Sequence, residues 1–416
     1  MAVVRPFKAV RPTKNLAEKV AALPYDVMTS DEARDMVKDN PYSFLHIDKA
    51  EIDLDKNVDI YSDEVYNKAL ENFNKMIDDK IYFQDEKPMF YIYTLTMNGK
   101  SQTGIVACTS IDEYIQNKIK KHELTRKDKE IDRIRHVNTL NANTGPIFLT
   151  YRSNDEINNI IENFKKDNKP VYDFVSEDNI GHKAWVIDNE NIINDIEKLF
   201  KQVDSLYIAD GHHRNASAVS VGLKRREENT QYDKNAEFNF YLSVLFPDNQ
   251  LHIMDYNRVV KDLNNLSSDE FFKLIEDKFE CKAYNGNGCF TPIKQHSFGL
   301  YIDGKWFELT AKDKIINEND PVLRLDVSIL QNELLEPILG IKDPRTDKRI
   351  DFVGGIRGLE ELEKRVDSGE MRAAFSMFPT SMEQLMDIAD AGKIMPPKST
   401  WFEPKLRSGL FIHLLK

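Results

Sequence analysis

The most distinctive chemistry in the sequence lies in the segment Tyr207-Ile-Ala-Asp-Gly-His-His-Arg214. An apolar strand is expected to end at Asp210, and Gly211 permits a sharp turn with a close approach of the backbone to a ligand. A helix is expected to start directly after this glycine. Its free N–H groups and the positive end of its dipole would point at one spot, which suits a phosphate group. We call Asp210–Arg214 the box.

Four polar side chains surround Gly211 in the box. Arg214 can hold a phosphate through two parallel hydrogen bonds, and Asp210 can hold Mg²⁺ directly or through water. His212 and His213 add further donors. A zinc ion shared by the two histidines is a weaker interpretation, because neighbouring helix positions face different ways and ligand pairs usually lie four residues apart. A buried strand followed by an aspartate N-cap would give the same pattern without function, but the density of polar groups favours a phosphate site.

A second candidate is the charge-dense segment 120–136, which concentrates basic residues in an acidic protein. His122-Glu123 lies at a break before an expected helix, and Thr125 is a candidate cap. Glu123 is a candidate general base, and Arg126 is a candidate phosphate contact. A solvated helix face with ion pairs explains the same pattern equally well.

The N-terminal loops offer a third set of polar residues, in Pro24-Tyr-Asp-Val27 and Asn40-Pro-Tyr-Ser-Phe-Leu-His46. Loops of this kind often line sites. Turn chemistry explains their prolines without any function, so a structural role is favoured here. The same holds for the loop Lys398-Ser-Thr-Trp401.

Hydrophobic periodicity and turn residues predict the elements that must position these groups. Hairpins are expected to turn at Asn98-Gly99 and Asp303-Gly304, and capping boxes are expected at Ser267/Glu270, for a helix through Phe279, and at Thr380/Glu383. Strands are expected over about 145–151, 205–210 and 238–246 and at the C-terminus. Helices are expected over about 62–79, 111–140, 154–167, 191–202, 211–229 and 326–339.

These elements predict an α+β protein with short mixed sheets. Regular alternation of strands and helices is absent, which argues against a Rossmann fold or a TIM barrel. The 416 residues are too many for one ordinary domain. Weak changes of pattern suggest three segments, 1–110, 111–255 and 256–416.

Composition excludes several classes of protein. The net charge of −12 argues against nucleic-acid binding. The N-terminus has no apolar stretch typical of a secretory signal, and no run of about 18 apolar residues predicts a membrane helix. Three widely spaced cysteines, Cys108, Cys281 and Cys289, are typical of a reducing cytoplasm. A bridge between the last two is a less favoured alternative.

At the box the chain resembles the ParB/sulfiredoxin-like superfamily, whose members bind nucleotides with a Gly-x-x-Arg type of box at the start of a helix. The Asp-Gly-His-His-Arg version is similar to that of the free L-serine kinases in this superfamily. Nearly the whole chain also resembles a bacterial and archaeal family long labelled as a domain of unknown function. The matching segments are RPFKAVRP, LPYDV, NPYSFLH, KKHELT, KEIDRIRH, YIADGHHR, DYNRVV and MPPKSTWFEPK.

The resemblance implies a ParB-like nucleotide-binding core within 111–255 and transfer of a phosphoryl group from ATP, or ADP, to free L-serine, with Mg²⁺ as cofactor. An earlier acidic residue acts as base in such kinases, and Glu123 is our candidate. The box residues would serve the phosphates, and Asp26 and His46 are candidates for holding serine. The implied partners are serine and a nucleotide, without nucleic acid or membrane, and a homodimer is left open.

Two other classes compete with the kinase hypothesis. A ParB-like regulator that binds DNA predicts a helix-turn-helix and a basic surface, and the sequence indicates neither. A phosphatase or nucleotide hydrolase remains open, because the same phosphate cradle serves water or a hydroxyl group as the acceptor.

Overall fold

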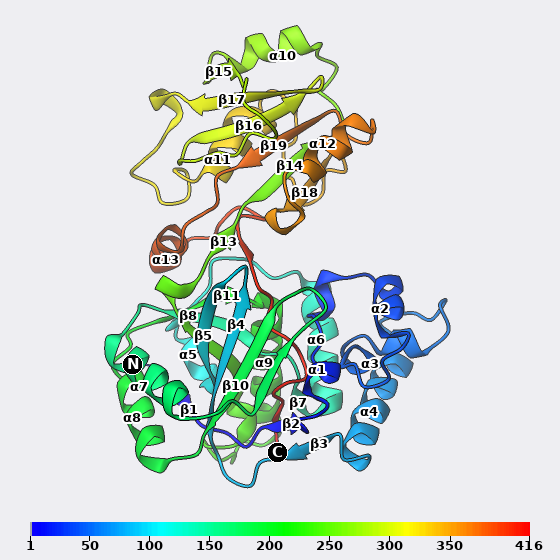
Figure 1. The fold of residues 1–416 in the computed structure, drawn as a ribbon, viewed down its shortest axis with the longest axis vertical. Coiled ribbons are helices and arrows are strands. Elements are labelled where there is room, and N and C mark those ends of the chain that lie inside the picture. Colours follow the sequence, from blue (N-terminus) through cyan, green and yellow to red (C-terminus); the bar gives the residue numbers. More distant parts are fainter. Residues whose placement is uncertain (1) are drawn as a thin grey trace. The chain divides into compact units, whose positions relative to one another are not determined.

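The computed structural model describes residues 2–416, and the chain divides into two compact units (Figure 1). Unit 1 comprises the chain up to Leu251 together with Pro404–Lys416, and unit 2 comprises His252–Glu403. The break expected near residue 255 lies close to this division. The break expected between 110 and 111 lies inside unit 1, because the strand that ends at residue 110 pairs with a strand that starts at residue 240. The end of the chain also returns to unit 1.

The elements of each unit follow in chain order. Unit 1 contains β1 Val4–Arg5, β2 Val10–Pro12, α1 Ala17–Val20, α2 Ser30–Val37, α3 Leu45–Asp48, α4 Asp63–Asp78, β3 Tyr82–Gln84, β4 Phe90–Met97, β5 Lys100–Ser110, α5 Ile111–Ile115, β6 Ile119–Lys120, α6 Lys127–Leu140, β7 Ala142–Asn143, β8 Ile147–Tyr151, α7 Asp155–Asp167, β9 Tyr172–Val175, β10 Gly181–Ile187, α8 Glu190–Phe200, β11 Leu206–Asp210, α9 His212–Glu228, β12 Phe240–Pro247 and β21 His413–Leu414. Unit 2 contains β13 Ile253–Met254, β14 Tyr256–Val260, α10 Ser268–Ile275, β15 Phe279–Ala283, β16 Ser297–Ile302, β17 Lys305–Ala311, α11 Asp326–Leu330, β18 Ile350–Gly354, α12 Glu360–Asp367, β19 Ala373–Met377, α13 Met382–Asp390 and β20 Trp401–Phe402.

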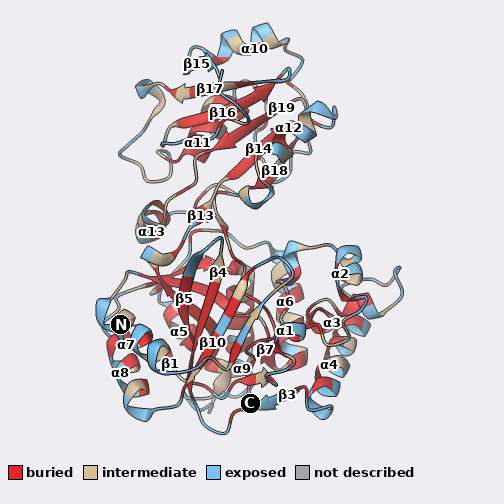
Figure 2. Cartoon of the chain, viewed as in Figure 1, coloured by how far each residue is buried: buried red, intermediate tan, exposed pale blue. Residues whose placement is uncertain are grey.

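A mixed nine-stranded sheet forms the centre of unit 1. Its order is β6-β11-β8-β12-β5-β4-β10-β9, and β1 also pairs with β5. The pairs β6–β11 and β8–β12 are parallel, whereas β12 and β4 both run antiparallel to β5. Its inner strands are almost wholly buried (Figure 2), as their apolar runs predict. The mixed α/β class is therefore confirmed, with a larger sheet than expected.

Helices cover this sheet and build a second core beside it (Figure 1). Apolar residues of α7 and α8, such as Ile157 and Ile196, join the core of the sheet. The N-terminal helices form a separate cluster that includes Phe44 and Phe73. In α4 Met76 is buried, whereas Ile77 is 38% exposed.

The charge-dense stretch 111–140 is helical at its two ends and interrupted between them, and the break expected at His122-Glu123 is present. It is interrupted because Ile119–Lys120 forms β6, which pairs with β11. The helix α6 then begins after Arg126, whose side chain makes no capping hydrogen bond. Thr125 does not cap this helix either, since its hydroxyl donates to Glu130 Oε2 at 3.0 Å.

The expected hairpins are both present. Asn98 and Gly99 turn with φ values of 51° and 74°, and Asp303 and Gly304 with 53° and 71°. Positive φ at both central residues matches the right-handed twist of the flanking strands.

Unit 2 is built on an antiparallel sheet of order β15-β17-β16-β19-β14-β18. The capping box of Ser267 and Glu270 is confirmed, although its helix ends at Ile275. The second capping box was predicted one residue too early: Ser381 caps the helix with Gln384. The helix expected over 326–339 changes at residue 331 into a π-helical turn that ends at residue 335.

Two sequence expectations concern the chain as a whole. Among residues 2–416, no helix is both long enough and apolar enough to span a bilayer. Cys108, Cys281 and Cys289 are all free thiols, so the alternative bridge between the last two is not formed.

Candidate functional site

The box joins β11 to α9 through a left-handed glycine. Gly211 is the N-cap residue of α9 and has φ 91°, a conformation that costs little only for glycine. A Cβ atom at this position would lie 3.3 Å from Nε of Arg214. Glycine therefore permits both the turn and the packing of a guanidinium group over the start of the helix.

Arg214 is held along one edge and open along the other. Its Nη1 donates to the carbonyl oxygen of Pro146 at 2.8 Å. Its Nε is buried and has no hydrogen-bond partner among the described residues. Nε and Nη2 both lie beside Gly211, so the open edge lies next to the helix start, where an oxyanion would be stabilised.

Asp210 is an ionised carboxylate whose charge is balanced by neighbouring cations. One carboxylate oxygen accepts the Gly211 N–H at 2.7 Å, and the other accepts from Lys405 Nζ at 3.0 Å. Burial alone would raise the pKa of Asp210, but Lys405 and Arg214 overcome this effect and hold the pKa well below its usual value. A carboxylate offers about four lone-pair sites, so these two hydrogen bonds leave lone pairs that Mg²⁺ can share. Coordination of Mg²⁺ by Asp210 is a proposal.

The pairing of β6 with β11 brings the second candidate segment to the box. Leu206 lies opposite Ile119 and Tyr207 opposite Lys120, in parallel register. Parallel strands end at the same edge of a sheet, so the residues after β6 lie beside the start of α9. As a result, Glu123 Oε2 lies 3.7 Å from His212 Nδ1.

Two further contacts fix α6 and its preceding loop against α9. The Arg126 backbone N–H donates to His213 Nε2 at 2.9 Å. The Ser217 hydroxyl donates to the backbone oxygens of Glu130, at 3.1 Å, and His213, at 2.7 Å. This packing requires a small side chain, and Ser217 is fully buried.

Three imidazoles stand in this region, and burial favours the neutral form of each. The rings of His122 and His212 meet edge to face, with centroids 4.5 Å apart. Burial lowers the pKa of His122 to about 4, against the opposing effects of the Asp210 charge and of the Ile208 carbonyl, which lies near the ring but outside hydrogen-bond geometry. Burial, helped by His122, also places the pKa of His212 well below its usual value. Burial lowers the pKa of His213, and Asp26 opposes that shift.

Buried polar atoms that have no hydrogen-bond partner within residues 2–416 gather at and beside the start of α9. Native proteins contain few such atoms, and each of them calls for an explanation. A bound ligand would supply the missing hydrogen bonds or coordinate bonds. The atoms concerned are both ring nitrogens of His122, Nε2 of His212, Nε of Arg214 and both amide atoms of Asn215.

The remaining predicted residues are placed differently. The Arg126 side chain is 72% exposed and pairs with Asp128 at 2.8 Å. Asp26 is close enough to affect the pKa of His213. His46 makes its ring contacts elsewhere, with Asp53 Oδ1 at 2.8 Å and the Asn40 carbonyl at 3.3 Å. The structure therefore does not bring His46 into contact with the box.

Sequence reasoning missed three residues of this region. Lys405 lies 195 positions after Asp210, and its only local signal is its place in the segment MPPKSTWFEPK. His122 stands next to Glu123 at the break before α6, and that break was the available signal. Asn215 has no signal beyond its place in the first turns of α9.

Several solved structures match most of this chain at low identity. A conserved hypothetical protein from Pyrococcus furiosus is 15% identical, with a TM-score of 0.36, over 74% of this chain and 95% of that chain. A free serine kinase in complex with AMP is 14% identical, with a TM-score of 0.36, over 73% and 91% of the two chains. SbnI with a C-terminal truncation, from Staphylococcus aureus, is 9% identical, with a TM-score of 0.37, over 73% and 85%.

No curated protein matches the sequence. A family model described as Protein of unknown function (DUF1015) matches residues 4–328. The matched range includes the box and the segment 120–136. Because the family model covers more than half of the chain, this protein belongs to the DUF1015 family.

Proposed function

We propose that the protein transfers a phosphoryl group from ATP, or from ADP, to the hydroxyl of free L-serine and so forms O-phosphoserine. The observation that carries the proposal is the start of α9, where unpartnered buried donors and a carboxylate surround a glycine turn. The similarity of the box to that of free-serine kinases supports this choice of substrate.

The phosphate groups would bind at the box. Phosphoryl transfer depends mainly on positioning and on neutralising the charge of the transferred group. The open edge of Arg214 and the N–H groups at the start of α9 are fixed before any ligand arrives. Donors fixed in this way stabilise developing charge without reorganisation.

Glu123 would act as the general base. Its side chain is 46% exposed, so serine can reach it, and its carboxylate lies beside His212 at the helix start. It would orient the serine hydroxyl and accept its proton. Asp26, which is exposed and close to His213, would hold the serine ammonium group. His46 would bind the serine carboxylate only after releasing Asp53 or Asn40.

Mg²⁺ fits the chemistry of this donor set. When bound with the nucleotide, it would neutralise charge on the phosphate oxygens. Asp210 would hold the ion with its remaining lone pairs or through water. Lys405 keeps this carboxylate ionised and oriented.

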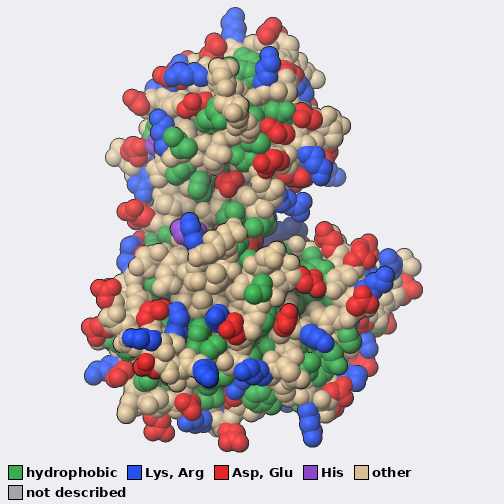
Figure 3. Space-filling model, in the orientation of Figure 1, with side chains coloured by type: hydrophobic (Ala, Val, Ile, Leu, Met, Phe, Trp, Pro, Cys, Tyr) green, Lys and Arg blue, Asp and Glu red, His purple; other side chains and the backbone are tan. Residues whose placement is uncertain are grey.

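A nucleotide hydrolase and a DNA-binding nucleotide regulator are the competing functions. The hydrolase would use the same phosphate cradle with water as the acceptor. The regulator needs a basic surface, whereas basic and acidic side chains are interspersed on the face drawn in Figure 3. Serine dependence and a DNA shift assay separate these functions from the kinase.

The test is product analysis with purified protein. The protein is incubated with Mg²⁺, with ATP or ADP, and with a panel of free amino acids, and O-phosphoserine is measured by mass spectrometry. Glu123→Gln should lower its formation at least about 100-fold, the range expected for loss of general base catalysis. Asp210→Asn should lower its formation as well, because it removes the carboxylate proposed to hold Mg²⁺. Glu177→Gln, at an exposed glutamate in another loop, is the matched control.

The outcomes distinguish the three functions. Serine-dependent O-phosphoserine that is lost in the two site variants and kept in the control supports the kinase. Nucleotide breakdown that is independent of serine favours the hydrolase. Absence of turnover with either nucleotide contradicts the kinase proposal.

A further inference from the structure

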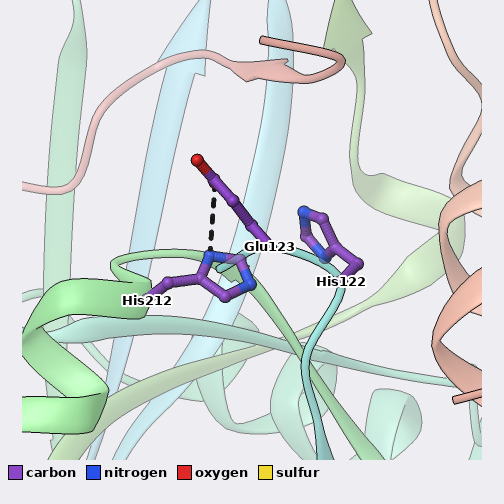
Figure 4. A group of neighbouring side chains, drawn as sticks. All are labelled: His122, Glu123 and His212. Atoms are coloured by element: carbon purple, nitrogen blue, oxygen red, sulfur yellow. Dashed lines mark ion pairs between the residues drawn. The ribbon is translucent and has the colours of Figure 1, made fainter. Parts of the chain in front are cut away.

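The box residue His212 comes together with His122 and Glu123 in an arrangement that can bind a metal ion, a role that the proposed transfer does not use. His122 and Glu123 follow β6, and His212 opens α9, so two segments contribute to the group (Figure 4). One ligand atom from each residue lies within 4.8 Å of the other two. The rings of His122 and His212 are inclined by 85°, so they do not stack on each other.

The hydrogen bonding of the two histidines is a second, independent observation. His122 is 2% exposed, and neither of its ring nitrogens has a hydrogen-bond partner among the described residues. His212 is 6% exposed, and its Nε2 is also without a partner. Leaving a buried polar group unsatisfied costs about 1–3 kcal/mol. Coordination of a metal ion would engage one nitrogen of each ring, because each imidazole offers one ligand atom to a given ion.

We propose that His122, Glu123 and His212 bind a divalent transition-metal ion of the Zn²⁺, Mn²⁺ or Co²⁺ class. Two imidazoles and one carboxylate form a ligand set that these ions accept, with open positions left for water or substrate. Mg²⁺ prefers oxygen ligands in a near-octahedral arrangement, so it is a poor match for this set. The site is thus distinct from the Mg²⁺ that accompanies a nucleotide.

The ligand atoms, which lie within 4.8 Å of one another, must draw closer to hold such an ion. Ligand atoms about 2.0–2.1 Å from a tetrahedral Zn²⁺ lie about 3.3 Å from one another. The Glu123 and His212 atoms are already 3.7 Å apart. The Glu123 side chain is 46% exposed, so its rotation toward the ion requires no repacking of the core.

Metal binding here does not depend on the proposed kinase, but its consequence for transfer rests on that function. A carboxylate bound to the ion cannot accept the serine proton, so an occupied site would compete with the role of Glu123 as base. The binding experiment therefore contains neither nucleotide nor serine, and its result is separate from the success or failure of the kinase test.

The experiment is a titration of chelator-treated full-length protein with Co²⁺, followed by visible absorption. We expect d–d absorption that saturates at one equivalent, that Zn²⁺ abolishes by competition and that equimolar Mg²⁺ leaves unchanged. Loss of a ligand should weaken Co²⁺ binding at least about 100-fold, since loss of mere outer-sphere partners costs 10–100-fold. The variants are His122→Asn, His212→Asn and Glu123→Gln.

Control variants distinguish the loss of a metal ligand from the loss of the fold. Glu123→Gln changes an exposed side chain and should leave the circular dichroism spectrum unchanged. His213→Gln removes the neighbouring imidazole of the same helical turn, which lies outside the group, and should retain Co²⁺ binding. Absence of stoichiometric binding by the folded protein would overturn the proposal. Displacement of Co²⁺ by equimolar Mg²⁺, or unchanged affinity in Glu123→Gln, would overturn it as well.

Discussion

Replacing Gly211 by alanine tests the backbone turn on which the proposed phosphate site depends. Gly211 has φ 91°, and the left-handed conformation costs an L-residue about 1–2 kcal/mol. The new Cβ would also lie 3.3 Å from Arg214 Nε, so the guanidinium must move by a few tenths of an ångström. A hydrogen bond to a charged group is worth about 1.5–3 kcal/mol. Losing about half of that energy weakens nucleotide binding about 3- to 12-fold.

Gly99→Ala is the matched control for this substitution. Gly99 has φ 74°, and nothing lies within 4 Å of its Cβ position. It should show the same loss of unfolding free energy in urea without any loss of affinity for ADP, which calorimetry measures. If Gly211→Ala binds ADP as tightly as the unmodified protein, the placement of a phosphate beside Arg214 is refuted. If its unfolding free energy is unchanged, the backbone argument is wrong.

The remaining predictions concern charge and packing. Lys405→Met removes the partner of Asp210, and because these side chains are 12% and 31% exposed, we expect a loss of about 1–2 kcal/mol at pH 7, below the 3–5 kcal/mol of a fully buried pair. The folded protein lowers the pKa of Asp210. The stability that this carboxylate contributes to the folded state is therefore present above its unfolded pKa of about 3.9 and is lost as the pH falls through the folded pKa. The difference in unfolding free energy between the variant and the unmodified protein, measured in urea, should shrink only below about pH 4. Burial raises the pKa of Asp326 to about 7, so unit 2 should lose up to about 4 kcal/mol between pH 4 and pH 7, and Asp326→Asn should abolish that slope in the same assay. Ser217→Leu should overpack the contact between α6 and α9, lower the unfolding free energy by about 1–3 kcal/mol and reduce nucleotide affinity in calorimetry, whereas Ser217→Ala should keep the packing.

Local signals in the sequence were sufficient to predict the glycine turn between β11 and α9. The strand, the glycine and the helix were all predicted at their observed positions, because an apolar run, a residue that tolerates positive φ and small helix residues act within a few positions of each other. The turn at Asn98-Gly99 was predicted for the same reason. The error in the capping box of α13 is of a different kind, since Thr380 and Ser381 are adjacent and chemically alike.

Long-range pairing was beyond the reach of these signals. The segment 120–136 fitted a solvated helix and a functional surface equally well, because charged residues at helical spacing serve both. The strand at its start, Ile119–Lys120, is too short to produce a periodic pattern. This short strand nevertheless fixes the parallel register that carries Glu123 to His212.

The same limit explains which site residues were found and which were missed. Glu123 and the box lie in separate segments, but each has a carboxylate or a set of donors that is recognisable alone. His122 is an ordinary residue in the sequence and gains its significance from burial beside His212 without a hydrogen-bond partner. Lys405 gains its significance from the carboxylate of Asp210, 195 positions earlier. Residues whose chemistry depends on a partner distant in the chain can be identified only when the fold has placed that partner, and both proposals made for this site depend on such pairs.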